Sequence, residues 1–148
     1  MDEFMNEALK EARKAFNKNE IPIGCVIVKD NKIISRAHNL REKKRNALCH
    51  AEVLAINKAC KKLKSWRLDD CDIYITLEPC GMCSGAILQS KIKNIYFGAY
   101  DQKAGMAGSR FNVFGIRFNY DPNVVGGIME EDCSKIIKDF FKRLRENN

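Results

Sequence analysis

Two short segments constrain this chain more than any other feature: His50-Ala51-Glu52 and Pro79-Cys80-Gly81-Met82-Cys83. A catalytic zinc site takes nitrogen and sulfur ligands from three residues and keeps a fourth position open to water. His50, Cys80 and Cys83 supply such ligands. Glu52 then remains free to take a proton from water and deliver it to a substrate.

The two cysteines are predicted to open a helix. A β-like run over residues 72–77 precedes them, and Pro79 is the residue expected at the first helical position, where its missing N–H costs nothing. Cys80 and Cys83, spaced i and i+3, then place their sulfurs on one face. The positive end of the helix dipole lowers the pKa of such thiols, which favours metal binding as thiolates.

His50 and Glu52 are predicted to lie at the start of a second helix. Side chains at i and i+2 point apart in the middle of a helix, so only its N-terminal end can present both. The apolar residues that follow recur at helical spacing: Val53, Ile56, Cys60 and Leu63.

The two segments together resemble the signature of the zinc-dependent cytidine and nucleobase deaminases, which is His-x-Glu followed at a distance by Pro-Cys-x-x-Cys. Within that superfamily the chain is similar to the bacterial tRNA adenosine deaminases of the TadA type. Further matches occur in the same order along nearly the whole chain: Ile21-Pro22-Ile23-Gly24, Ala37-His38-Asn39, Thr76-Leu77-Glu78-Pro79-Cys80, Phe97-Gly98-Ala99, Gly108-Ser109 and Asp139-Phe140-Phe141.

The resemblance implies a three-layer α/β fold of the cytidine-deaminase type, with a five-stranded mixed sheet between helices and both metal-binding helices on one side. It implies one zinc ion per subunit, held by His50, Cys80 and Cys83, with Glu52 as the catalytic proton carrier. The implied reaction is hydrolytic deamination of the wobble adenosine to inosine in a tRNA anticodon loop. The implied assembly is a homodimer.

The resemblance also implies substrate-binding residues. Asn39 matches an amide that hydrogen-bonds the target nucleoside, although asparagine is also common in loops. Asp101 and Lys103 match positions that meet a ribose hydroxyl and a phosphate of the anticodon loop, and the alternative is a simple turn. Phe141 matches an aromatic residue near the RNA, but its helical spacing with neighbouring apolar residues fits a core position equally well.

Two residues depart from the family pattern. Cys49 stands directly before His50, in a segment where many relatives have Pro-Thr-Ala, and its thiol could be a fourth ligand that closes the site and makes it structural. Tyr120 stands where relatives often have histidine, which bears on RNA contacts and leaves the chemistry unaffected.

The charge of the chain favours a polyanionic partner such as RNA. It has 26 Lys and Arg against 19 Asp and Glu, a formal net charge of +7. From Glu130 onward the sequence predicts a helix with an apolar face and a basic stripe, which is either an RNA contact or a solvated face. The stripe consists of Lys135, Lys138, Lys142 and Arg145. The polar segment 41–45 is either a solvated loop or a rim of the substrate site.

The length of 148 residues predicts a single domain over residues 1–148. Seven scattered cysteines, an acidic amphipathic N-terminus and the lack of a long apolar run predict a cytoplasmic protein without a disulfide framework or a membrane span. The other predicted elements are a helix over 3–16, strands over 23–28 and 32–37 joined by a turn at 29–31, a strand over 73–77, a helix from Cys80 to about Gln89 and a strand over 92–98.

Three alternative functions remain open at this point. A free guanine or cytosine deaminase would use the same zinc constellation on a small base. A structural zinc module that binds RNA would hold its metal through four ligands and catalyse nothing. A thiol redox protein would use Cys80 and Cys83, but it would leave His50 and Glu52 without a role.

Overall fold

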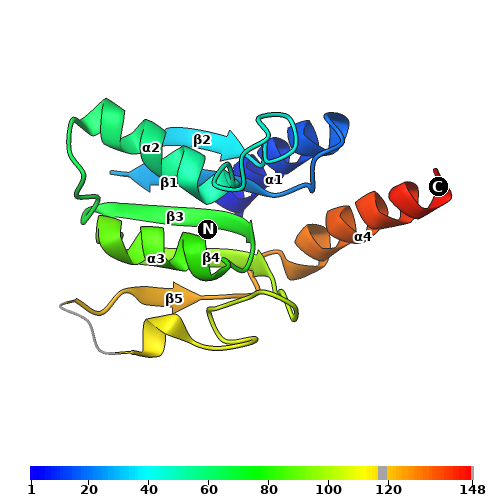
Figure 1. Cartoon of the computed structure of the whole chain (residues 1–148). Helices are drawn as coiled ribbons and strands as arrows, with labels where there is room; N and C mark the ends of the chain where they lie inside the picture. The colour runs from blue at the N-terminus through cyan, green and yellow to red at the C-terminus, as the bar shows by residue number, and fades with distance from the viewer. Residues whose placement is uncertain (117–119, 148) are drawn as a thin grey trace.

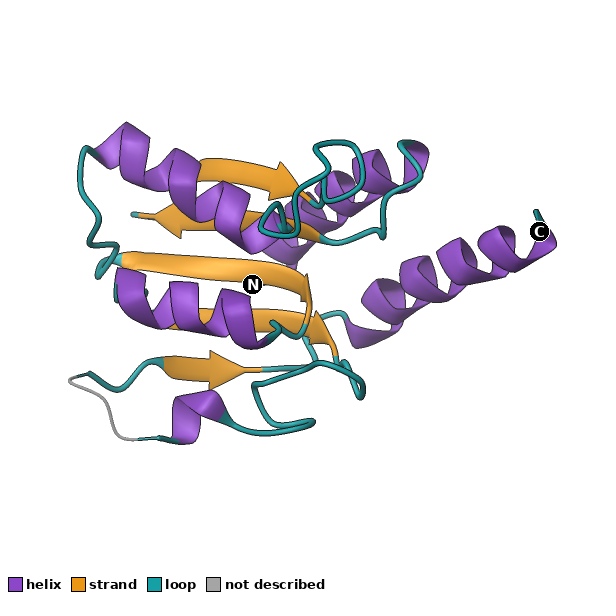
Figure 2. Cartoon of the chain, in the orientation of Figure 1, coloured by secondary structure: helices purple, strands orange, loops and turns teal. Residues whose placement is uncertain are grey.

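The computed structural model describes residues 1–116 and 120–147, and its central feature is a mixed five-stranded sheet with helices on both faces (Figures 1 and 2). The elements are α1 (Asp2–Asn17), β1 (Gly24–Lys29), β2 (Lys32–His38), α2 (Ala51–Leu63), β3 (Cys71–Leu77), α3 (Gly81–Ser90), β4 (Asn94–Ala99), the 3₁₀ turn η1 (Val113–Gly115), β5 (Asn123–Val125) and α4 (Glu130–Glu146).

The strands lie in the order β2-β1-β3-β4-β5. β1 is antiparallel to both of its neighbours, whereas β3, β4 and β5 are parallel. The β1–β2 hairpin turns at Asp30 and Asn31, which have φ of 51° and 61°, as a tight turn between two strands requires. The predicted α/β class, the mixed sheet and this hairpin are therefore confirmed.

Alternating side chains of the strands build a separate apolar core on each face of the sheet. Ile73 and Ile75 of β3 belong to the core under α2 and α3, while Tyr74 belongs to the core under α1 and α4. The prediction that the two helices with the candidate metal ligands share one side of the sheet is confirmed. No helix in residues 1–116 or 120–147 has the length and apolar character needed to span a bilayer.

Most predicted elements agree with the structure within two residues, and the differences have local causes. The strand predicted from residue 92 starts at Asn94, because Ile92 is buried before the ladder begins and Lys93 bonds to Cys71 from outside it. β5 was not located in the sequence. Its three residues, Asn123–Val125, are too few to show an alternating pattern.

Gly24 allows α1 to lie unusually close to β1. A Cβ atom at this position would overlap the carbonyl oxygen of Ala8 and lie 2.5 Å from the backbone nitrogen of Ala12. Both contacts are with helix backbone, which cannot move aside as a flexible side chain can. The packing of α1 therefore requires glycine here.

We expect Gly24→Ala to lower the free energy of unfolding by about 1–3 kcal/mol, because α1 must move off the sheet. Gly85→Ala on α3 is the matched control, since a Cβ there meets no atom within 4 Å. The control should leave stability unchanged or raise it by up to about 1 kcal/mol. Urea unfolding of both variants measures the difference, and equal stabilities would contradict the close packing.

Candidate metal centre and active site

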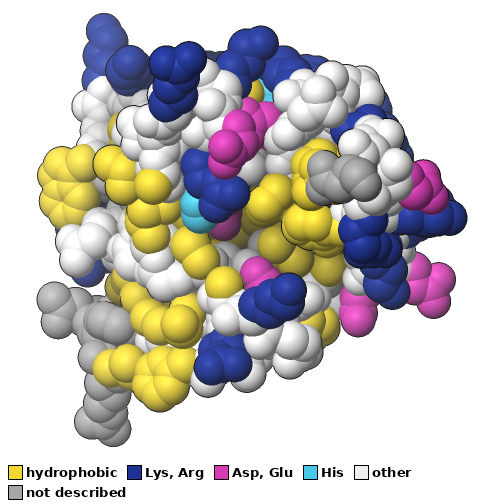
Figure 3. All heavy atoms as spheres, turned by 45° about the vertical axis from the view of Figure 1, so that its right-hand side comes forward, with side chains coloured by type: hydrophobic (Ala, Val, Ile, Leu, Met, Phe, Trp, Pro, Cys, Tyr) yellow, Lys and Arg dark blue, Asp and Glu magenta, His cyan; other side chains and the backbone are white. Residues whose placement is uncertain are grey.

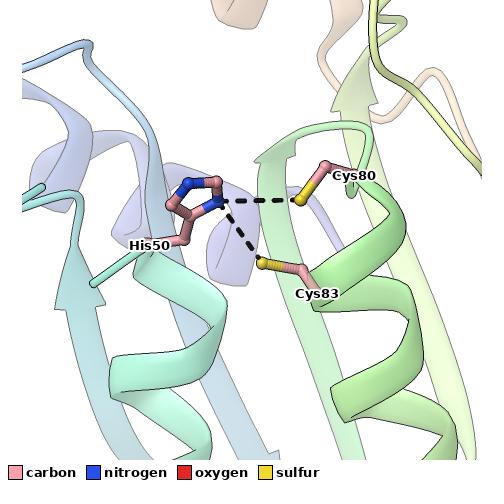
Figure 4. A group of neighbouring side chains, drawn as sticks. All are labelled: His50, Cys80 and Cys83. Atoms are coloured by element: carbon pink, nitrogen blue, oxygen red, sulfur yellow. Dashed lines mark hydrogen bonds between the residues drawn. The ribbon is translucent and has the colours of Figure 1, made fainter. Parts of the chain in front are cut away.

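The candidate ligands lie at the N-terminal ends of two neighbouring helices. His50 and Cys80 are the residues that precede α2 and α3, both with extended backbone, and Cys83 lies in the first turn of α3 (Figure 4). The prediction that both motifs open helices is confirmed. The placement of Pro79 at the first helical position was wrong, because the chain stays extended through Cys80 and the helix begins at Gly81.

The three side chains converge on a space that suits a metal ion. Nδ1 of His50 lies 3.7 Å from Sγ of Cys80 and 3.6 Å from Sγ of Cys83, and the ligand atoms all lie within 4.8 Å of one another. Tetrahedral zinc with ordinary Zn–N and Zn–S bonds separates its ligand atoms by about 3.6–3.8 Å. The observed separations fit that geometry.

Hydrogen bonds among the three candidate ligands shift their pKa values. The hydrogen bond with Cys83 lowers the pKa of Cys80 to about 4 and raises the pKa of Cys83 well above its ordinary value. The hydrogen bond with Cys80 raises the pKa of His50. A divalent cation would displace these protons, because it binds the thiolate and neutral imidazole forms.

Glu52 lies in the first turn of α2 and is only 4% exposed. Burial raises the pKa of Glu52 to about 7, so its carboxyl group can hold or release a proton near neutrality. In the part of the chain that the structure describes, the metal-competent group consists of His50, Cys80 and Cys83 and contains neither Glu52 nor the buried Cys49. This geometry argues against Cys49 as a fourth ligand.

A cavity of about 540 Å³ opens beside the ligands. Its lining includes seven of the eight predicted site residues: Asn39, His50, Glu52, Cys80, Asp101, Lys103 and Phe141. Cys83 is fully buried behind them. Figure 3 shows a hollow with a histidine, bordered by hydrophobic side chains and by Lys and Arg.

The predicted substrate residues differ in how firmly the protein holds them. Asn39 is buried, with Oδ1 accepting from the backbone N–H of Arg41 and Nδ2 donating to the carbonyl of Ile21. The carboxylate of Asp101 accepts hydrogen bonds from the backbone N–H groups of Lys103 and Ala104, so this segment forms the turn that was the alternative to an RNA contact. Both Asp101 and Lys103 also line the cavity.

Phe141 is not a core residue. It is 37% exposed and lines the cavity, whereas its neighbour Phe140 is buried and packs edge-on against Phe16. Tyr120 lies away from the cavity lining. Its hydroxyl donates to the carbonyl of Ile87, and Lys91 lies over its ring.

The sequence did not single out Glu78, which the structure shows to hold the loop at residues 101–109. This carboxylate is 2% exposed and accepts hydrogen bonds from the backbone of Asp101 and Ala107 and from both the backbone and the hydroxyl of Ser109. Burial would raise the pKa of Glu78, but these hydrogen bonds outweigh it and lower the pKa. The signals in the sequence were its place between a strand and the Cys80 segment and its presence in the matched segment Thr76-Leu77-Glu78-Pro79-Cys80.

Comparison with known proteins supports a deaminase. The family model of the MafB19-like deaminases matches residues 1–145. The tRNA-specific adenosine deaminase of Bacillus subtilis is 47% identical over 144 residues, which is 97% of this chain and 89% of the relative.

Two solved structures are informative. One, from a study of A-to-I editing by tRNA:A34 deaminases at the wobble position, is 38% identical, with a TM-score of 0.88 over 92% of this chain and 99% of that one. A guanine deaminase from Bacillus subtilis is 40% identical, with a TM-score of 0.65 over 75% of this chain and 71% of that one. By its sequence and its fold, this chain belongs to the MafB19-like deaminase family.

Proposed function

We propose that this protein is a tRNA-specific adenosine deaminase, which hydrolyses the wobble adenosine of a tRNA anticodon to inosine. The observation that carries the proposal is one cavity shared by the metal-ligand group, the buried Glu52 and the predicted RNA contacts Asn39, Asp101 and Lys103. The identity of about 47% with tRNA-specific adenosine deaminases over nearly the full chain supports the choice of substrate.

His50, Cys80 and Cys83 would hold one zinc ion per subunit, since two thiolates and an imidazole favour zinc among the common divalent metals. When bound, zinc supplies the Lewis acid that makes water reactive near neutral pH. Glu52 carries two protons in turn. Its carboxylate takes one proton from the attacking water and gives it to the ring nitrogen of adenine; it then takes the second proton from the hydroxyl now bonded to C6 and gives it to the amino group, which leaves C6 as ammonia.

The other cavity residues bind and orient the RNA. The amide of Asn39 is held in place by its own hydrogen bonds and meets the target nucleoside, while Asp101 and Lys103 meet a ribose hydroxyl and a phosphate. An anticodon base is already in a single-stranded loop, so moving it into the cavity costs little. Phe141 lies at the same cavity and offers a surface for stacking.

The proposed enzyme is a cytoplasmic homodimer. The large apolar side chains that are about half exposed are the candidate contacts for a second copy. They include Leu48, Phe111 and Ile116.

The purified, zinc-loaded protein should form inosine in tRNA and release no ammonia from free adenosine, cytidine, cytosine or guanine. Activity on tRNA should fall steeply as salt rises, because phosphate contacts release counterions. Guanine is the principal alternative substrate, given the 40% identity with a guanine deaminase. Ammonia from guanine at a salt-independent rate, with tRNA unchanged, would overturn the proposal.

Glu52→Gln should lower kcat by about 10²–10⁴, because it removes the proton carrier while keeping the shape of the side chain. Zinc content and tRNA affinity should stay close to wild type, since Glu52 lies outside the ligand group. Single-turnover inosine formation and metal analysis measure the two effects. Near-normal turnover would exclude this role for Glu52.

Cys83→Ser should remove most of the bound zinc, whereas Cys49→Ser should retain one zinc per chain. The reason is that Cys83 lies 3.6 Å from Nδ1 of His50 and Cys49 lies outside the ligand group. Metal analysis of both variants, with circular dichroism as the folding control, makes the comparison. Zinc loss in Cys49→Ser would instead support a closed, four-ligand structural site.

A further inference from the structure

The loop at residues 41–45 carries a dense positive charge at the edge of the cavity. It contains four cationic residues and one carboxylate, Glu42, and all five are exposed. Arg41 lines the cavity and pairs with Glu42 at 3.2 Å. Within residues 1–116 and 120–147, Lys43, Lys44 and Arg45 take part in no ion pair. Their charges are therefore available to a ligand.

A buried carboxylate fixes the backbone of this loop. Glu20 is 1% exposed, and its two oxygens accept from the N–H of Glu42 at 3.0 Å and the N–H of Lys43 at 2.7 Å. Oδ1 of Asn39 accepts from the N–H of Arg41 at 3.1 Å. Burying a carboxylate is costly unless it is well hydrogen-bonded, and both of these Glu20 bonds go to this one loop.

The hydrogen bonds also give the loop a defined shape. The N–H of Lys44 bonds to the carbonyl of Leu40, which forms one helical turn, and Arg45 takes a left-handed conformation with φ of 50°. Glu20 and Asn39 satisfy the free N–H groups at the start of that turn, as caps do in a helix. The backbone that carries these cations is therefore fixed, with Arg41 lining the cavity and Lys43, Lys44 and Arg45 following it in an exposed turn.

We propose that loop 41–45 binds phosphates of the RNA strand next to the base that enters the cavity, and that Glu20 is the positioning residue for this contact. The proposal rests on the proposed function, because it requires an RNA substrate. Loop 41–45 would be a recognition element additional to Asp101 and Lys103 and separate from them in the chain, because it follows β2 whereas those two residues follow β4.

The first test compares two double variants with equal loss of charge. Lys43→Gln with Lys44→Gln removes two loop cations, and Lys61→Gln with Lys62→Gln removes two exposed cations from the far end of α2, about 16 Å along the helix from His50. Binding of an anticodon stem-loop RNA is measured against salt. The loop variant should reduce the slope of log affinity against log salt by about 1.4, since each phosphate contact contributes about 0.7.

The control pair should leave the slope near the wild-type value. Equal slopes for the loop variant and wild type, or equal reductions in both variants, would overturn the inference. RNA binding with normal salt dependence but without inosine formation would overturn the proposed function and leave this inference standing. Failure of the wild-type protein to bind the stem-loop would overturn both.

The second test concerns Glu20. Glu20→Gln should weaken RNA binding by roughly three- to tenfold at low salt and little at high salt, because it acts through phosphate contacts. When Glu20→Gln is combined with Lys43→Gln and Lys44→Gln, it should cause no further loss of RNA affinity. Glu11→Gln is the matched control: Glu11 is also buried, at 3% exposed, but it bonds to Lys14 and His38 between α1 and β2.

Glu11→Gln should lower stability and leave RNA affinity unchanged wherever the protein is folded. Urea unfolding and zinc content are measured for both variants, so that a loss of folded protein is not mistaken for a loss of binding. An affinity loss in Glu20→Gln that persists at high salt, or that adds fully to the loop variant, would show a general structural effect and overturn the positioning role.

Discussion

The site depends on the direction of three strands. β2, β3 and β4 run the same way, because β1 is antiparallel to both of its neighbours and β4 is parallel to β3. Their carboxyl ends therefore meet at one edge of the sheet, where open α/β sheets commonly bind ligands. The segments that leave this edge carry Asn39, Cys80 and Asp101, and the N-terminal ends of α2 and α3 bring His50 and Cys83 to the same place.

Three glutamates near this edge are all buried, but their surroundings give their carboxyl groups different hydrogen bonds. Glu20 and Glu78 accept hydrogen bonds from loop backbone, and they hold residues 42–43 and 101–109 respectively. Glu52 faces the cavity and the thiols, and burial raises its pKa to about 7, whereas the hydrogen bonds to Glu78 lower its pKa. When the pKa of one carboxyl group is raised and that of another is lowered, the first is suited to proton transfer and the second stays ionised. Glu52 is of the first kind and Glu78 is of the second.

The features that could be predicted from the sequence are those set by residues a few positions apart in the chain. The i, i+3 cysteines and the His-x-Glu segment led to the helix starts and the candidate ligand group, whereas the five-stranded sheet between helices came from the family resemblance. The sequence did not predict what depends on contacts between distant segments: Glu20 meets residues 22 and 23 positions away, and Glu78 meets residues 23 to 31 positions away. Helical spacing also could not place Phe141, because one face of α4 passes from the core to the cavity edge.

In the proposed mechanism the zinc ligands and Glu52 do not select the substrate, because a guanine deaminase that is 40% identical to this chain acts on a different base. Under the proposed function the substrate is selected at the cavity rim, where Arg41 and residues 101–104 add charge and hydrogen-bonding groups beside the candidate metal ligands. Loops 41–45 and 101–109 are each held through the backbone by a buried carboxylate, which leaves their outer side chains free to differ without disturbing the fold. In the proposed enzyme, RNA recognition and deamination chemistry are therefore assigned to separate residues, and Glu20 and Glu78 hold the loops that would carry the RNA contacts.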